Sequence, residues 1–146
     1  MRALLQRVTC ASVQVDERVI GAIDGGWTVL LGVGLADTDA IADRLAQRVA
    51  NLRAFPDAQG RMNRSLLETG GAALVISQFT LYADTSHGRR PSFTEAAPGD
   101  RAAPLVERFI AGLRALGIEV ATGEFGAHMV VDLTNDGPVT FLVAQE

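Results

Sequence analysis

The stretch that most constrains this chain is Ala73–Asp84, which reads A-L-V-I-S-Q-F-T-L-Y-A-D. It follows a Gly-Gly breaker pair and begins with an unbroken apolar run, which predicts a buried strand. Because side chains alternate along a strand, Gln78 and Thr80 are expected on one face. Ser77 and Phe79 are expected on the other. A buried strand with such groups must satisfy them through local bonds or use them as pocket donors, and this stretch alone leaves both readings open.

The rest of the chain has the composition of one compact domain. It has 146 residues, 48% of them hydrophobic, so we predict a single domain over residues 1–146. No apolar run reaches the roughly 18 residues of a membrane span, and Met1–Val8 resembles a strand rather than an export signal. Cys10 is the only cysteine, which excludes an intrachain disulfide. We therefore expect a cytoplasmic protein in which Cys10 is a small packed residue.

The charge of the chain limits the nucleic acids that it could bind. The net charge is −4, from 13 basic and 17 acidic residues. Because duplex binding depends on neutralising phosphates, an acidic chain is a poor candidate for it, although a local basic patch could contact one end of an RNA. The stretch Ala83–Pro98 is long for a loop, which indicates function or disorder, and it carries Arg89 and Arg90. Arg61 and Arg64 follow a shorter polar turn, for which a solvated loop is the favoured interpretation.

Two helices are predicted from apolar periodicity. The first is Asp37–Ala54, in which apolar side chains at helical spacing between Ile41 and Leu52 form one stripe. The second is Arg101–Leu116, and we expect it to begin close to Pro104, since proline is tolerated only near the first turn. A turn at residues 135–138 is expected to join the last two strands. Besides the central strand, we predict strands at Arg2–Val8, Ser12–Val15, Arg18–Ile23, Trp27–Val33, Ile118–Thr122, His128–Thr134 and Val139–Val143.

Several kinds of catalytic site are missing from the sequence. The two histidines, His87 and His128, are not at metal-ligand spacing from each other or from Cys10, so we predict no metal site and no cofactor. There is no G-x-S-x-G element, phosphate loop or dinucleotide fingerprint. The polar side chains within apolar strands are neutral, and they suit oxyanion stabilisation and positioning better than proton transfer. They are Ser77, Gln78, Thr80, Thr134 and Thr140.

Two motifs of the chain carry a resemblance to a known family. S-Q-F-T-L-Y-A-D at Ser77–Asp84 and N-D-G-P-V-T-F at Asn135–Phe141 resemble the two signatures of the D-aminoacyl-tRNA deacylase family. The similarity runs through essentially the whole chain in order. Each short motif alone is weak evidence, but together, at compatible spacings, the motifs are specific for this family. The supporting motifs are Gln6–Val8, Ala11–Val13, Leu30–Val33, Gly60–Asn63, Gly88–Phe93 and Thr122–Gly126.

The resemblance implies a fold, an assembly and an activity. The fold would be an α/β single domain of three layers, with curved mixed and antiparallel β-sheets and two main helices on one face. The assembly would be a homodimer with two composite active sites. The activity would be hydrolysis of the ester that joins a D-amino acid, or glycine mischarged on tRNA-Ala, to the 3′ adenosine of tRNA. Such proofreading would release free D-amino acid and tRNA and reject L-aminoacyl-tRNA.

The resemblance also assigns site residues. Ser77, Gln78, Phe79 and Thr80 would line the catalytic site. Gly137-Pro138 is similar to the family's Gly-cisPro element, which would enter the pocket of the partner subunit. Two further positions are Met129, which matches a pocket-lining methionine, and His128, which departs from the small or acidic residue expected there.

The residues leave the mechanism and two other functions open. Nothing obvious supplies a base, so we favour activation of water by the 2′-hydroxyl of the substrate ribose, with covalent attack by Thr80 or Ser77 as the alternative. The first alternative function is that of a related deacylase subfamily, in which a relaxed pocket admits and removes mischarged L-alanine. A non-catalytic RNA-binding module is disfavoured, because the chain is acidic and has no basic stripe. We expect Arg89 and Arg90 to meet phosphates near the acceptor end of tRNA, and Arg61 and Arg64 are the next candidates for such contacts.

Overall fold

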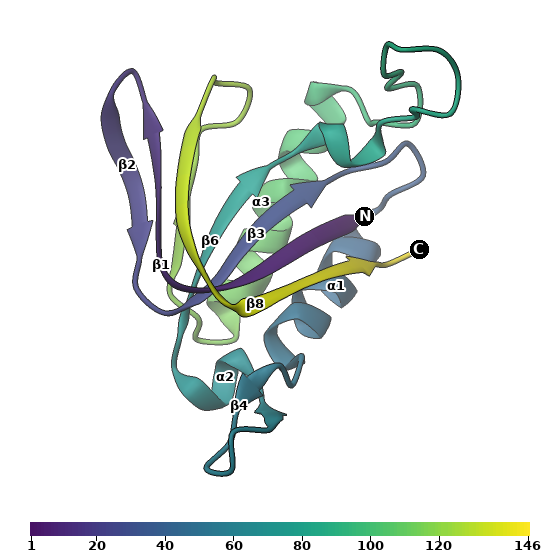
Figure 1. The fold of residues 1–146 in the computed structure, drawn as a ribbon. Coiled ribbons are helices and arrows are strands. Elements are labelled where there is room, and N and C mark those ends of the chain that lie inside the picture. The colour runs from purple at the N-terminus through teal and green to yellow at the C-terminus, as the bar shows by residue number, and fades with distance from the viewer.

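The structure, a computed structural model, describes residues 1–146 as one α/β domain built on a bent sheet with helices against one face (Figure 1). The sheet contains β1 (Arg2–Val15), β2 (Arg18–Ile23), β3 (Gly26–Gly32), β6 (Ala72–Ser77), β7 (Val120–Thr122) and β8 (Val130–Ala144). The helices are α1 (Asp39–Asn51), α2 (Leu66–Thr69) and α3 (Gly99–Ala115), and a short hairpin joins β4 (Phe55–Pro56) to β5 (Met62–Arg64). None of the helices is long and apolar enough to cross a membrane.

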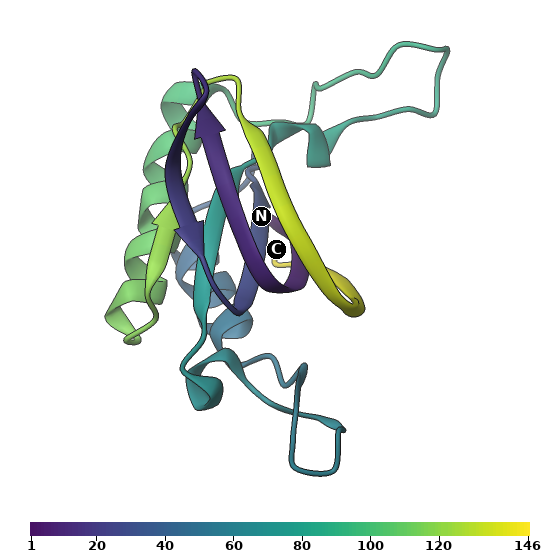
Figure 2. The same cartoon turned by 60° about the vertical axis from the view of Figure 1, so that its left-hand side comes forward.

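Strand β1 organises the sheet. It pairs antiparallel with β3 through its first half, with β2 through its second half, and with β8 along most of its length. Strand β6 then pairs parallel with β3, and β7 pairs parallel with β6. The sheet bends so strongly that β2 approaches β7, and a Cβ at Gly21 would lie 2.7 Å from the carbonyl oxygen of Thr122. The nearly closed sheet places its two halves face to face (Figure 2).

Two apolar cores stabilise this arrangement. The larger one lies between the sheet and helices α1 and α3, and Trp27 and Phe109 are its largest fully buried side chains. The smaller one, which includes Val13, Leu74 and Ile76, lies within the bend of the sheet. Strand β3 is buried along nearly its whole length, as its continuous apolar sequence predicts.

The helices follow the sequence pattern with small differences. Helix α1 begins two residues later and ends three residues earlier than predicted. Helix α3 begins at Gly99, five residues before Pro104, so the prediction that it begins close to Pro104 is wrong. The proline lies in the second turn, where its missing N–H leaves the carbonyl oxygen of Asp100 without a helical donor, and the helix continues through it. The C-terminal end of α3 has the geometry typical of a glycine at the C′ position. Gly117 has a φ of +86°, and the backbone N–H of Ile118 donates to the carbonyl oxygen of Leu113 at 3.2 Å.

Three predictions about the sheet are wrong. Arg2–Val8 and Ser12–Val15, predicted as separate strands, form the single strand β1. The turn predicted at residues 135–138 is a bulge within the continuous strand β8, since the register on β1 jumps from Gln6 with Thr140 to Val8 with Asn135. Turn residues suit a bulge as well as a hairpin, so the sequence could not distinguish them. Cys10 is exposed rather than packed, because it lies on the outward face of β1, where its thiol meets the hydroxyl of Thr134 at 3.6 Å.

Candidate active site

The predicted central strand ends earlier than its sequence suggests. Strand β6 stops at Ser77, and residues Phe79–Tyr82 form one turn of 3₁₀ helix. The alternation expected for Gln78 and Thr80 is therefore wrong beyond this point. Gln78 extends the parallel pairing of β6 with β3 by one hydrogen bond, since its backbone N–H donates to the carbonyl oxygen of Leu31 at 2.8 Å. The chain then turns across the end of β3.

A glycine on β3 permits this turn. A Cβ at Gly32 would lie 3.0 Å from the carbonyl oxygen of Gln78 and 3.1 Å from the Cβ of Leu81. The 3₁₀ helix therefore packs directly on the backbone of β3. Because the first amides of such a helix have no acceptor within it, Phe79 and Thr80 present N–H groups at the end of β6.

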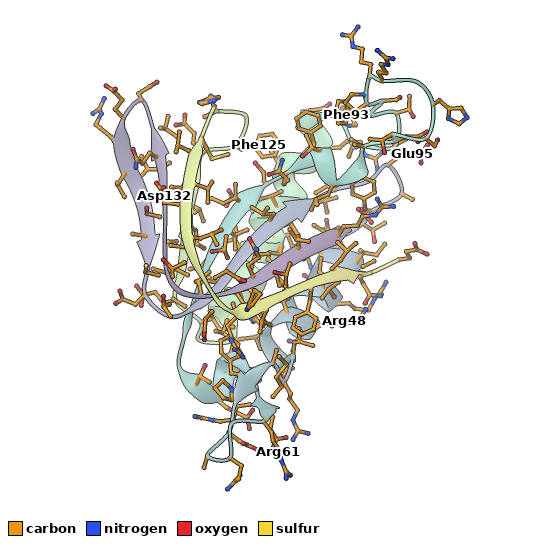
Figure 3. The ribbon with its side chains drawn as sticks, viewed as in Figure 1. Arg48, Arg61, Phe93, Glu95, Phe125 and Asp132 are labelled. Atoms are coloured by element: carbon orange, nitrogen blue, oxygen red, sulfur yellow. The ribbon has the colours of Figure 1, made fainter.

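A cavity of about 530 Å³ opens beside this turn. Its walls come from the ends of β3 and β6, the start of α3, the loop at residues 125–127 and the residues that lead into β8. Eleven of its sixteen lining residues are hydrophobic, which is typical of a pocket that excludes water from most of a ligand. In Figure 3, Phe125 lies between β8 and α3 at the end of the molecule where this cavity opens.

The structure brings four of the predicted site residues together. Ser77, Gln78, Phe79 and Met129 all line the cavity. Thr80 does not line it, but its hydroxyl accepts a 2.5 Å hydrogen bond from the side-chain amide of Gln78. Thr80 can therefore orient the Gln78 amide without contacting the cavity.

Gly137 and Pro138 lie away from this cavity, on the bulge of β8. Both residues are exposed, and the peptide bond between them is cis. The side-chain amide of Asn135 holds the bulge by donating to the carbonyl oxygens of Arg7 and Val139, each at 3.0 Å. The partly buried guanidinium of Arg7 adds an ion pair, since its Nε lies 3.2 Å from Oδ2 of Asp136.

The predicted arginines lie on the surface. Arg89 and Arg90 are exposed in the loop between Ala83 and Pro98. Arg61 is exposed at the tip of the β4–β5 hairpin, at the opposite end of the molecule from Phe125 (Figure 3). The loop that carries Arg89 and Arg90 lies at the end of the molecule opposite the β4–β5 hairpin (Figure 1).

Sequence reasoning missed several residues of the cavity. Phe125, which is 44% exposed, lines it, and only the motif T-G-x-F-G hinted at its importance. His128, which the resemblance had already named beside Met129, does line the cavity and is the only ionisable side chain among the lining residues. The other histidine, His87, is exposed beside Asp84 and Ser86, and hydrogen bonds from Ser86 hold the pKa of Asp84 below its usual value. No group of three or more His, Cys, Asp or Glu side chains in the chain could hold a metal ion.

Neutral donors and free amides beside a largely apolar cavity define the kind of site that a hydrolase of ester bonds uses to polarise a carbonyl group. The model of the D-Tyr-tRNA(Tyr) deacylase family matches residues 4–144. The chain therefore belongs to this family, and it is a hydrolase.

Individual relatives agree with the family and with the fold. The chain is 64% identical over 143 residues to a D-aminoacyl-tRNA deacylase of Roseiflexus castenholzii, covering 98% of this chain and 91% of that one. A solved structure titled "c-Myc DNA Unwinding Element Binding Protein" is 37% identical with a TM-score of 0.92, covering 99% of this chain and 98% of that one. Another, titled as a probable eukaryotic D-amino acid tRNA deacylase, shares the fold with a TM-score of 0.85 at 18% identity, covering 97% of each chain. The single α/β domain predicted from the sequence is thus confirmed.

Proposed function

We propose that this chain hydrolyses the ester between a D-amino acid and the 3′-terminal adenosine of tRNA. The observation that carries the proposal is the cavity at the end of β6, where Ser77, Gln78 and Phe79 lie together in a chain of the deacylase family. A volume of about 530 Å³ lies in the range of pockets for small ligands. The substrate tRNA is cytoplasmic, and we place the enzyme there.

The terminal adenosine is the part of the substrate that suits the cavity best. Its base is flat and weakly polar, and the walls of the cavity are mostly apolar. Phe125 and His128 supply aromatic faces at the wall, and unstacked bases bind on such faces. The amino acid would then lie towards the 3₁₀ helix, with its ester carbonyl near the amides of Phe79 and Thr80.

The chemistry requires a polarised carbonyl, a positioned water and a base. The free amides of Phe79 and Thr80 would stabilise the oxyanion, and the side chain of Gln78 would position the reactants. No carboxylate or amine lines the cavity, and this proposal places its one histidine, His128, against the adenine base rather than at the ester. The 2′-hydroxyl beside the ester would therefore assist the attack of water on the carbonyl carbon. The ester C–O bond breaks, the 3′-oxygen leaves with a proton, and the free amino acid is released.

Discrimination between D- and L-amino acids requires a structural element that the single chain does not place at its own cavity. Gly137 and Pro138 are exposed and distant from the lining residues, so they could meet a substrate only in a second copy of the chain. In a homodimer, their backbone carbonyls would hold the α-amino group and leave no volume for an L side chain. Such steric rejection needs a rigid part, and the bonds of Asn135 and Arg7 supply rigidity here. Glycine has no side chain and would pass the filter.

Nucleic-acid binding without catalysis is the second candidate, because the structural relative at 37% identity is titled as a DNA-element binding protein. The two functions differ in turnover and in salt dependence. We would measure release of D-tyrosine from D-tyrosyl-tRNA by catalytic amounts of enzyme, together with a salt titration of tRNA binding. Multiple turnovers would support the esterase. Tight, salt-dependent binding without turnover would support the binding module and refute the esterase.

A further inference from the structure

The 3₁₀ helix that carries the free amides is held at its far end by Tyr82. The guanidinium of Arg2 lies 4.3 Å from the centre of the Tyr82 ring, and it also donates a 2.9 Å hydrogen bond to the carbonyl oxygen of Leu81. The hydroxyl of Tyr82 donates to Oδ2 of Asp37 at 3.3 Å. Burial, with the nearby Asp37 carboxylate, raises the pKa of Tyr82 to about 12, so the phenol stays a neutral donor at any ordinary assay pH.

Asp37 connects this end of the helix to two other segments. It is buried, with 7% of its surface exposed, and its Oδ2 accepts a 2.6 Å bond from the amide of Gly34. Its Oδ1 accepts a 2.5 Å bond from the amino group of Met1. One carboxylate thus joins β1, the loop before α1 and the 3₁₀ helix.

The packing around Tyr82 leaves no room for adjustment. A Cβ at Gly34 would lie 2.6 Å from Cε1 of the Tyr82 ring and 2.9 Å from its hydroxyl oxygen. A Cβ at Gly32 would lie 3.2 Å from Cδ2 of the same ring. The ring therefore rests on bare backbone at the end of β3, and its position fixes the end of the 3₁₀ helix.

We propose that Arg2, Asp37 and Tyr82 are positioning residues, which fix the 3₁₀ helix so that the amides of Phe79 and Thr80 face the reacting carbonyl. None of the three lines the cavity, so each acts through the backbone rather than on the substrate. The inference rests on the proposed function for its effect on catalysis. Catalysis depends steeply on such geometry, since a displacement of about 1 Å can cost roughly a hundredfold in rate.

Two substitutions at one position test the proposal. Tyr82→Leu removes the ring, and we expect kcat for D-tyrosyl-tRNA to fall by about tenfold or more, with KM within about twofold. Tyr82→Phe keeps the ring and its contact with Arg2 but loses the hydrogen bond to Asp37, so kcat should fall by a smaller factor than in Tyr82→Leu. Asp37→Asn should also lower kcat. If that variant fails to fold, the comparison of Tyr82→Leu with Tyr82→Phe tests the proposal without it.

A control variant separates positioning from general stability. Arg108→Met removes the solvent-exposed ion pairs of Arg108 with Asp39 and Asp43, at 3.0 and 2.8 Å, which join α3 to α1 and do not involve a residue that lines the cavity. Its kcat and KM should both be unchanged at a temperature well below unfolding. An equal loss of kcat in Arg108→Met and Tyr82→Leu would overturn the proposal.

Amide hydrogen exchange supplies a readout that does not depend on activity. The amides of Leu81 and Ala83 donate to Gln78 and Thr80, at 3.3 and 3.1 Å, within the turn. In Tyr82→Leu they should exchange at least about tenfold faster, while the amides of β6 keep their protection. Unchanged exchange at Leu81 and Ala83 would overturn the proposal, even if kcat fell. If the unmodified protein did not hydrolyse D-aminoacyl-tRNA, the proposed function would fail, and the exchange measurement would still decide whether these residues hold the helix.

Discussion

Substitution of Gly123 by alanine should move a single side chain into the cavity. A Cβ at Gly123 would lie 2.4 Å from Sδ of Met129 and 3.1 Å from Cδ1 of Ile76. Non-bonded contacts are normally about 3.5 Å or more, so Sδ of Met129 must move by about 1 Å. Gly123 is not among the glycines with positive φ, so its backbone can accept alanine without strain. Because Met129 lines the cavity, the displaced side chain would reduce the space for a ligand.

The expected cost falls on binding rather than on stability. A shifted methionine rotamer costs about 0.5–1.5 kcal/mol of folding free energy. Replacing a glycine by alanine restricts the unfolded chain, and this offsets about 0.4–1 kcal/mol of that cost. The melting temperature should therefore change by only about 4 °C or less. A misfit of one methyl group in an apolar pocket is worth about 1–3 kcal/mol, so kcat/KM should fall by about 10- to 200-fold.

The assay compares two substrates that share the adenosine but differ in side chain. If the cavity holds the adenosine, Gly123→Ala should lower kcat/KM for D-tyrosyl-tRNA and for glycyl-tRNA by the same factor. The double variant Gly123→Ala/Met129→Ala removes the displaced side chain and should recover most of the loss. A fall confined to D-tyrosyl-tRNA would refute the reasoning, because it would mean that the cavity holds the amino-acid side chain.

Three further predictions test the chemistry and the RNA contact. Charged tRNA that ends in 2′-deoxyadenosine should bind normally but be cleaved far more slowly, while Ser77→Ala and Thr80→Ala keep appreciable activity; an acyl-enzyme trapped on either residue would contradict this. Gln78→Ala should lower kcat by less than the roughly 10²–10³-fold cost of losing one oxyanion donor, since the backbone amides survive, and unchanged turnover would place this side chain outside the site. The Arg89→Ala/Arg90→Ala variant should raise KM and lower the slope of binding affinity against salt by about one unit for each phosphate interaction that it removes, and an unaltered slope in a binding titration would argue against RNA contact.

Local patterns in the sequence predict the parts of the fold that depend on local physics. The apolar stripe from Ile41 to Leu52 predicts α1 because side chains at this spacing come together on one buried face only if the segment is helical. Gly117 predicts the end of α3 because few other residues adopt its positive φ. The polar pair Asp16-Glu17 separates the predicted strands that end at Val15 and begin at Arg18, and both residues have positive φ in the turn that joins β1 to β2.

The parts that the sequence does not predict depend on contacts between distant segments. Residues Phe79–Tyr82 alternate between apolar and polar much as a strand does, and only their packing on Gly32 turns them into a helix. Asp37 is the first residue of the helix predicted from the sequence, but it precedes α1 and its carboxylate bonds to Met1 and Tyr82, far away in the chain. Such partners become visible only when the sheet has brought β1, β3 and β6 side by side.

The central claim concerns chirality, and one measurement tests it most directly. The same tRNA would be charged with D-tyrosine and with L-tyrosine, and the rate of ester hydrolysis above the uncatalysed background would be measured for each with the unmodified protein. The account predicts rapid release of D-tyrosine and no enzymatic release of L-tyrosine. Efficient hydrolysis of L-tyrosyl-tRNA, or no hydrolysis of D-tyrosyl-tRNA, would contradict it.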